Sequence, residues 1–266
     1  MIIIDPIASQ SENDFIYQWL DARFYNSLGI TFFLERTKDN HAKWELLRVY
    51  DLDVSDLLLG IAIISIEGTC FWLPDERDVN RLLCSTLLER RPKRIVTNTI
   101  GHDLLHRFIG EWGHITREYD QWIMVCSKHV PKATGRLALV SDIDQLVEYQ
   151  ALYNQERAVK ETPDWMLLIK QRKIAVYEVD GKIVSIIRFG IETNRLVSIG
   201  GTYTFPSYRR QGFAQCVLAF VVNHIVDHGR IAHLIVDKEN NPAVELYNKM
   251  GFEYVGSSYT VYPDYL

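Results

Sequence analysis

The stretch FPSYRRQGFA, residues 205–214, lies between a strand-like segment and a helical one and decides the fold around it. Apolar residues recur at helical spacing over 214–225, and Gly229 is placed to end that helix. Residues 209–214 are therefore predicted to form a loop and the first turn of a helix. A helix start exposes unpaired backbone N–H groups and the positive end of the peptide dipoles, which suits an anion. Gly212 would let a phosphate approach closely, and Arg209 and Arg210 would add positive charge.

The segments on both sides of this loop predict a mixed α/β domain. Three extended segments lead into it, 173–179, 182–192 and 195–205, and the first two are joined by the hairpin dipeptide Asp180–Gly181. Helical segments precede them at 142–159 and at 162–172, where Thr162 is the predicted N-cap and Pro163 the first helical residue. A short strand at 233–239 and a helix ending at Gly251 follow.

Two motifs found in this order resemble signatures of the GNAT superfamily of N-acetyltransferases. Arg209, Gly212 and Ala214 fit R/Q-x-x-G-x-G/A, the coenzyme A pyrophosphate loop. The segment NNPAVELYNKMGF, residues 240–252, is similar to N-x-x-A-x-x-L-Y-x-K-x-G-F, with matches at Asn240, Ala243, Leu246, Tyr247, Lys249, Gly251 and Phe252. The resemblance covers about residues 137–262 and extends to a group of predicted bacterial acetyltransferases with an extra N-terminal half. It implies a GNAT fold, a splayed and mostly antiparallel sheet flanked by helices.

The resemblance also implies where acetyl-coenzyme A, as cosubstrate, would bind. Its pyrophosphate would lie over residues 209–214, and its pantetheine would pair with the backbone of residues 202–204. The implied coenzyme-binding residues are Thr202, Tyr203, Thr204, Arg209, Arg210, Gln211, Gly212, Phe213, Ala214 and Asn240. Tyr247 falls where the family often has the general acid that protonates the departing thiolate, although its periodicity alone would also make it a core aromatic residue.

The general base is less well marked. Glu192, near the end of a predicted strand, is the candidate, and the alternative is a solvated turn residue beside Thr193 and Asn194. Glu161 and Asp164 precede or open a helix, where acidic residues commonly interact with the helix dipole, and they would also suit a cationic acceptor.

The leading functional prediction is an N-acetyltransferase that moves an acetyl group from acetyl-coenzyme A to a primary amine of a small molecule or peptide. Direct attack of the amine in a ternary complex needs no covalent enzyme intermediate. Two alternatives stay open: tRNA-dependent aminoacyl transfer by a tandem GNAT protein, and a non-catalytic acyl-coenzyme A-binding module. The intact RRQGFA loop and the net charge of -5 count against the tRNA reading.

The N-terminal half has the same order of predicted elements and resembles a second, degenerate GNAT domain. Where a pyrophosphate loop would fall, residues 73–78 read LPDERD, with no glycine and three acidic residues that would repel an anion. We therefore expect no coenzyme binding there. The predicted organisation is a degenerate domain at 1–130, a linker at 131–136 and a catalytic domain at 137–266.

Composition limits the remaining partners. The pI near 5.9 gives no global attraction to nucleic acid, and no apolar run approaches the ~20 residues that span a bilayer, so neither nucleic acid nor membrane is expected. Four cysteines without a CxxC pattern indicate a reducing cytoplasm. The pairs His102/His106 and His224/His228 have metal-compatible spacing but do not form an HExxH motif, so no metal is expected. Monomer and homodimer both stay open.

Overall fold

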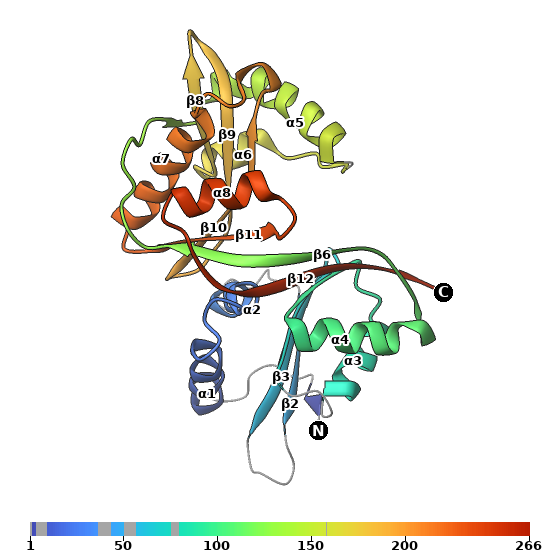
Figure 1. Cartoon of the computed structure of the whole chain (residues 1–266). Helices are drawn as coiled ribbons and strands as arrows, with labels where there is room; N and C mark the ends of the chain where they lie inside the picture. The colour runs from blue at the N-terminus through green and yellow to red at the C-terminus, as the bar shows by residue number, and fades with distance from the viewer. Residues whose placement is uncertain (1, 4–9, 37–43, 51–56, 76–79, 158) are drawn as a thin grey trace. The chain divides into compact units, whose positions relative to one another are not determined.

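The chain folds into two compact units, neither of which is continuous in sequence. The computed structural model describes residues 2–3, 10–36, 44–50, 57–75, 80–157 and 159–266. Unit 1 consists of residues 1–123, 235–240 and 254–266, and unit 2 of residues 124–234 and 241–253. The ribbon in Figure 1 is coloured along the chain, so the late segments of unit 1 can be followed in red.

Unit 1 is an α/β unit with a mostly antiparallel sheet in the order β1-β2-β3-β4-β5-β12-β6, in which β4 and β5 are parallel. Its helices and strands are β1 (Ile2–Ile3), α1 (Gln10–Asp21), α2 (Leu28–Glu35), β2 (Trp44–Tyr50), β3 (Leu58–Ser65), β4 (Thr69–Pro74), α3 (Asn80–Glu89), β5 (Arg94–Thr97), α4 (Thr99–Phe108), the 3-10 turn η1 (Ile109–Glu111), β6 (Gly113–Cys126) and β12 (Glu253–Tyr265). The last residues of β6 and the first residue of β12 fall in unit 2.

Helices cover both faces of this sheet, which explains why every residue of β3 is buried. On one face, Ile61 and Ile63 pack with residues of α1 and α2 such as Trp19 and Ile30. On the other, Ala62 and Ile64 pack with α3 and α4. Figure 1 shows α1 and α2 on the opposite side of β2 and β3 from α3 and α4. A strand buried on both faces loses the alternation of polar and apolar residues, as the run LLGIAII does.

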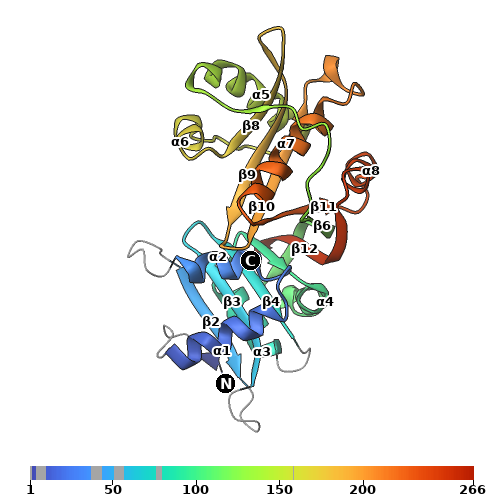
Figure 2. The same ribbon diagram turned by 90° about the vertical axis from the view of Figure 1, so that its left-hand side faces the viewer.

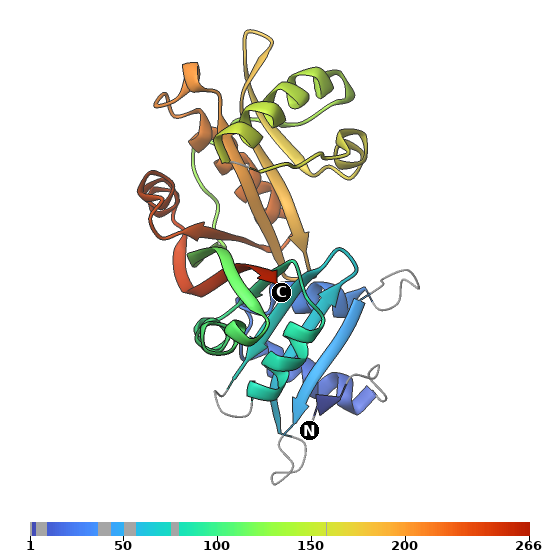
Figure 3. The same cartoon turned by 90° about the vertical axis from the view of Figure 1, so that its right-hand side faces the viewer.

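Unit 2 has the sheet order β11-β10-β9-β8-β7, parallel only between β10 and β11. Its elements are β7 (Arg136–Leu137), η2 (Val140–Asp142), α5 (Ile143–Arg157), α6 (Trp165–Lys170), β8 (Ile174–Val179), β9 (Lys182–Glu192), β10 (Leu196–Thr204), η3 (Pro206–Tyr208), α7 (Phe213–Asp227), β11 (Ile231–Asp237) and α8 (Asn241–Lys249). Figures 2 and 3 show α7 on one side of β8, β9 and β10, and α5 with α6 on the other.

The core of unit 2 follows from the pattern of each helix. The apolar stripe of α7 is buried, with Val217, Leu218, Val221, Val222 and Ile225 all fully covered, and it packs on β8, β9 and β10. The opposite face of the sheet holds a second cluster with α5 and α6, formed by Ala138, Leu146, Tyr149, Trp165, Ile174, Val176, Ile183, Ile186 and Tyr203.

The two halves of the chain repeat one order of elements. Two helices, three antiparallel strands, a helix, a parallel strand, a helix and a last strand run from α1 to β6 and again from α5 to β12. The predicted mixed α/β fold, with a mostly antiparallel sheet flanked by helices and duplicated along the chain, is confirmed. The boundaries at 130 and 137 remain a prediction.

One helix start differs from the sequence expectation. Helix α6 begins at Trp165 and is capped by Asp164, whose side chain accepts a hydrogen bond from the Leu167 N–H at 2.9 Å. The predicted cap, Thr162, and Pro163 therefore lie before the helix. Aspartate is at least as good an N-cap as threonine, and here the cap nearest the apolar run is the one used.

Candidate active site

Strand β10 leaves most of one edge without a strand partner. It pairs in parallel with β11 through three positions, Leu196 with Ile231, Val197 with Ala232 and Ser198 with His233. Beyond Ser198, no described strand pairs with this edge, although the other edge stays paired with β9 as far as Thr204. The sheet of unit 2 therefore offers free backbone groups on β10, which an extended ligand can meet as an added strand.

A bulge interrupts β10 where that open edge begins. The register with β9 shifts between Gly200 and Tyr203, and Gly201 has a φ of +59°. This positive φ favours glycine, and a Cβ at Gly201 would lie 2.4 Å from Nε of Arg188, whose side chain would have to move. The Tyr149 hydroxyl donates to the Gly201 carbonyl at 3.2 Å and holds the bulge from the α5 side.

The loop after β10 delivers the start of α7. Its turn η3 spans Pro206–Tyr208, and Gly212 is the N-cap of α7 with a φ of +84° and open space around its Cβ position. Within the described residues, no acceptor meets the backbone N–H groups of 210–215. The start of α7 therefore has a glycine cap and a row of free N–H donors, which is the geometry that suits an anion; anion binding there stays a prediction.

The two arginines of this loop have different surroundings. Arg209 donates from Nε to the Thr204 carbonyl at 2.9 Å and pairs with both carboxylate oxygens of Glu156 at 2.8 Å. It therefore fastens the loop to β10 and α5. Arg210 is exposed, with a φ of +64° and no ion pair among the described residues. Of the two, Arg210 is the cation left for a bound anion.

The remaining loop residues fix its shape. The Gln211 side chain donates to the Ser207 carbonyl at 3.3 Å. The Phe213 ring packs against Tyr177 of β8 with ring centroids 5.1 Å apart, while Ala214 follows in the first turn of α7. Asn240 directly precedes α8, which begins at Asn241 and so leaves Asn240 at the cap position.

Tyr247 and Thr202, both predicted for the site, meet in the structure. Tyr247 lies on α8 with 9% of its surface exposed, and its phenol is hydrogen-bonded to the side chain of Thr202 on the bulged part of β10. Burial raises the pKa of Tyr247, against the lowering effect of the Thr202 hydrogen bond. The phenol therefore keeps its proton at neutral pH and holds it beside the open edge of β10.

Glu192 lies in a different environment. Its carboxylate, at the end of β9, forms ion pairs with Lys173 and with Arg230, the latter at 2.9 Å. Burial acts to raise the pKa of Glu192, but hydrogen bonds from both cations outweigh it and the pKa is lowered. A carboxylate held ionised in this way is a weak proton acceptor. Its role as general base stays a prediction, and its contacts favour a structural ion pair.

Helix α5 adds a face that sequence analysis missed. Tyr149, Tyr153 and Glu156 follow one another at i, i+4 and i+7, and the rings of both tyrosines pack against Tyr203 at 5.4 and 6.3 Å. Glu156 accepts a hydrogen bond from the Tyr203 hydroxyl at 3.0 Å. The helical spacing was visible in the sequence, but nothing in it showed that this face lies against β10.

The segment between α5 and α6 is held by specific contacts. The Asn154 amide donates to the Glu161 carbonyl at 2.8 Å, and its oxygen accepts from the Glu161 N–H at 3.3 Å. The Glu161 carboxylate pairs with Arg188 at 2.9 Å, and the Arg188 guanidinium lies 5.1 Å from the centre of the Tyr153 ring. Glu161 therefore belongs to the same cluster as the α5 face.

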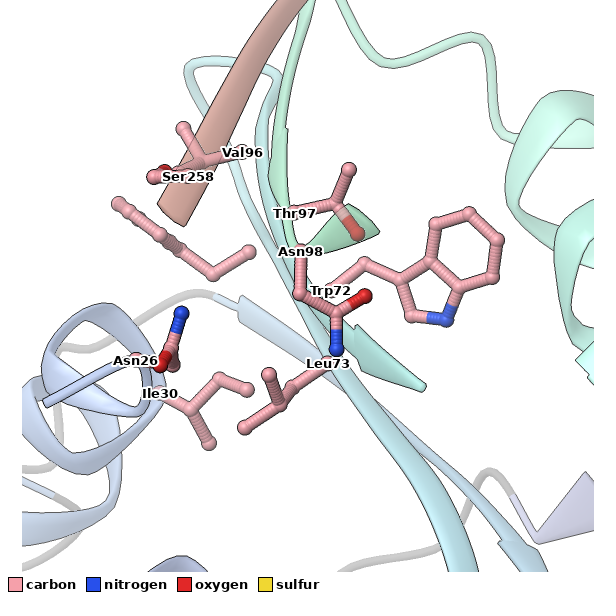
Figure 4. A pocket seen from close by; sticks show the side chains of 9 residues that line it. Asn26, Ile30, Trp72, Leu73, Val96, Thr97, Asn98 and Ser258 are labelled. Carbon is pink, nitrogen blue, oxygen red and sulfur yellow. The ribbon is translucent and has the colours of Figure 1, made fainter. Parts of the chain in front are cut away.

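Unit 1 has different residues where a second coenzyme loop would fall. Asp75 follows β4 and pairs with Arg23, while Glu76 and Asp78, which the sequence analysis also invoked, lie outside the described residues. A small pocket (Figure 4) is lined by residues of α2, β4, β5 and β12 and of the segments just before α2 and just after β5: Asn26, Ile30, Phe71, Trp72, Leu73, Val96, Thr97, Asn98 and Ser258. The Asn98 side chain is used to cap α4 at Gly101 and to donate to the Pro74 carbonyl.

No helix in the described part of the chain is both long and apolar enough to cross a membrane.

Comparison with known proteins agrees with this geometry. Residues 142–252 match the model of the acetyltransferase (GNAT) family. No curated protein matches the sequence significantly. A GNAT-family acetyltransferase from Colwellia psychrerythraea has a similar structure, with a TM-score of 0.56 at 15% identity over 99% of this chain and 100% of that one.

Two further solved structures support the same fold. A GCN5-related N-acetyltransferase from Sphaerobacter thermophilus has a TM-score of 0.56 at 16% identity, over 81% of this chain and 79% of that one. A Drosophila protein reaches a TM-score of 0.67 at 11% identity over 98% and 99% of the two chains. At such identities the likeness concerns the fold. The family match shows that residues 142–252 are a domain of the acetyltransferase (GNAT) family, and the similar structures agree with its fold.

Proposed function

We propose that unit 2 transfers an acetyl group from acetyl-coenzyme A to a primary amine of a small molecule or peptide, by direct attack in a ternary complex. One observation carries the proposal: the protonated phenol of Tyr247 meets Thr202 at the open edge of β10. That edge continues along the chain into the free N–H groups at the start of α7. A proton donor on α8 thus lies beside the strand edge, and that edge continues along the chain into the proposed anion site at the start of α7.

Each part of the coenzyme has a group on this chain that suits it. The N–H groups of 210–215 and the Arg210 guanidinium would hold the pyrophosphate, because a helix start favours anions. The strand edge of β10 around Thr202, which has no strand partner on that side among the described residues, would pair with the pantetheine amides and stabilise negative charge on the thioester oxygen. The coenzyme would supply the activated acetyl group.

Tyr247 would act at the leaving sulfur. As the amine nitrogen forms its bond to the acetyl carbon and the carbon–sulfur bond breaks, the phenol would donate its proton to the thiolate. The attacking amine must lose a proton in the same reaction, and this proton would pass to solvent water. Glu156 and Glu161 lie on the α5 side of β10. Their carboxylates would attract a cationic amine, although each is paired with an arginine.

The coenzyme site is tested by isothermal titration of the full chain with acetyl-coenzyme A. Gly212→Glu places a negative charge at the proposed pyrophosphate seat and should weaken binding at least about 100-fold. Gly229→Glu is the matched control: Gly229 follows the other end of α7, has a φ of +68° and also has open space at its Cβ position. It imposes the same backbone strain and should leave the dissociation constant unchanged.

The chemistry is tested by thiol release in the presence of a panel of amines and amino-terminal peptides. Release that depends on an amine and is lost in Gly212→Glu would support acetyl transfer. Tight coenzyme binding without amine-dependent release would indicate a non-catalytic binding module. Absence of binding by the folded wild type would overturn the proposal.

A further inference from the structure

Two histidines and a glutamate of unit 1 bring three donor atoms together at one point of the surface. His102 and His106 lie one turn apart on α4, and Glu118 lies on β6. Oε2 of Glu118 is 2.9 Å from Nε2 of His102 and 2.7 Å from Nε2 of His106, and the two Nε2 atoms are 3.0 Å apart. The sequence spacing offered only the histidine pair; the fold supplies the carboxylate.

The three side chains are held in place by their surroundings. The His102 ring stacks on Tyr259 of β12, with centroids 4.1 Å apart and an interplanar angle of 20°. Helix α4 is anchored by the Asn98 cap and by buried Leu104 and Leu105. Glu118 is on the exposed face of β6, where residues alternate between exposed and partly buried. The cluster is accessible, with His106 and Glu118 exposed by 47% and 41%.

Hydrogen bonding alone does not satisfy this cluster. An imidazole Nε2 either carries a proton and donates, or carries a lone pair and accepts. If both nitrogens donate to the Glu118 carboxylate, two N–H groups face each other at 3.0 Å. If one accepts, its lone pair faces the carboxylate oxygen. Every assignment of the ring protons to an ionised Glu118 therefore leaves one of the three contacts unmatched, whereas a cation accepts all three lone pairs.

The spacing also suits a small metal ion. The three separations describe a nearly equilateral triangle, with each donor about 1.7 Å from its centre. An ion about 1.2 Å above that plane would lie about 2.0 Å from every donor, the usual zinc–nitrogen and zinc–oxygen distance. We propose that His102, His106 and Glu118 bind one first-row divalent transition metal ion of the Zn²⁺ class, with water at the remaining positions.

The nearby charges are compatible with an added cation. Lys238 is the cation that reaches the Tyr259 ring, 5.8 Å from its centre, and its charge is balanced by Asp120 at 2.7 Å. Two imidazoles and one carboxylate are a donor set that suits zinc and its neighbours rather than calcium or magnesium, which prefer oxygen ligands. Among the residues that the structure describes, the other histidine pair with this spacing lacks such a set.

That second pair, His224 and His228 on α7, provides an internal control. The rings are 4.7 Å apart, but Nδ1 of His228 donates to the His224 carbonyl at 2.7 Å, and no carboxylate joins the two rings among the described residues. The two pairs have the same sequence spacing. Only His102 and His106 are joined by a carboxylate among the described residues, so only they can form a three-ligand site.

The full chain is first treated with a chelator and then titrated with Zn²⁺, and binding is measured by calorimetry. The absorption spectrum of bound Co²⁺ is a second readout of coordination. We expect one ion per chain at this site. Glu118→Gln, which keeps the shape and a hydrogen-bonding oxygen, and His106→Gln should each weaken binding more than about tenfold. His228→Gln should leave it unchanged. Circular dichroism of each variant shows whether it is folded.

Specific outcomes would overturn the proposal. Wild-type protein that binds no Zn²⁺, or that binds it equally well after Glu118→Gln, would reduce the cluster to a hydrogen-bonded surface group. Loss of binding on His228→Gln would move the site to α7. The experiment measures metal binding by unit 1. A negative result would therefore contradict the metal site without bearing on coenzyme binding or acetyl transfer by unit 2.

Discussion

Tyr247 is the residue whose substitution tests the chemistry most directly. Tyr247→Phe removes the phenolic proton and keeps the buried ring, which packs against Phe252 at 5.5 Å. If the phenol protonates the leaving thiolate, kcat should fall by about 100-fold or more while the dissociation constant for acetyl-coenzyme A stays nearly unchanged. Tyr254→Phe, at an exposed tyrosine, is the control. Unaltered turnover in Tyr247→Phe would mean that the ring is a core residue only.

At the scale of residues, motif and fold contribute differently to the site. Gly212 and Tyr247 could be predicted because the motif requires their types at fixed spacing. The contact between Tyr247 and Thr202 joins positions 45 residues apart, and it exists only once α8 lies beside the β10 bulge. Glu156 escaped prediction because its partners, Arg209 and the Tyr203 hydroxyl, are far along the chain.

At the scale of elements, the corner between β7 and η2 predicts a pH-dependent stability. Arg136 forms two hydrogen bonds to Asp142, at 2.6 and 3.0 Å, and the Leu139 N–H donates a third at 2.7 Å. Burial acts to raise the pKa of Asp142, but these bonds outweigh it and the pKa is lowered. The ionised carboxylate therefore stabilises the fold above its unfolded pKa of about 3.9, and this contribution is lost as the pH falls through the folded value.

Asp142→Asn should lower the free energy of unfolding by about 2 kcal/mol at pH 7, less than for a fully buried pair because Arg136 is one-third exposed. The difference from wild type should shrink below about pH 4, as urea titrations at several pH values would show. Glu178→Gln, which removes the more exposed partner of the same arginine, should cost under about 1 kcal/mol. A difference for Asp142→Asn that persists unchanged at low pH would contradict this account.

The ends of helices and strands are predicted less well from the sequence than the elements themselves. The strands and the helix around residues 205–214 follow their patterns closely, since apolar periodicity and the glycine cap agree. Helix α6 starts later than Thr162 suggested, because two cap residues compete in TPD and the contacts of Asn154 hold the backbone at Glu161 in a non-helical path. Competing local signals are settled by tertiary contacts.

At the scale of the whole molecule, the duplicated fold predicts one coenzyme per chain. Unit 1 repeats the order of strand and helix, but its β4 ends at Pro74 and is followed by Asp75, and no glycine occurs in residues 73–78. Calorimetry with acetyl-coenzyme A should give a stoichiometry near one, and Gly212→Glu should remove all of the heat. A stoichiometry of two, or a second site that survives Gly212→Glu, would show that unit 1 also binds the coenzyme.

The assignment of β12 to unit 1 lies beyond what local sequence patterns can predict. Tyr259, Thr260 and Val261 pair antiparallel with Thr97, Val96 and Ile95, and Val261 is fully buried in the core of unit 1. The repeat would place this last strand with unit 2, because it follows α8 as β6 follows α4. Period-2 alternation identifies a strand and leaves its partner undefined, since pairing is a contact between distant positions.

That pairing has a consequence for how the protein is made. The ribosome completes β5 more than 150 residues before it reaches the partner strand β12, so at ordinary elongation speeds the interval is on the order of ten seconds. During that time β5 can pair with β4 but lacks its other neighbour, and the apolar position that Val261 later fills is open. Most of unit 1 is therefore synthesised first, but its sheet can be completed only when the end of the chain has been made.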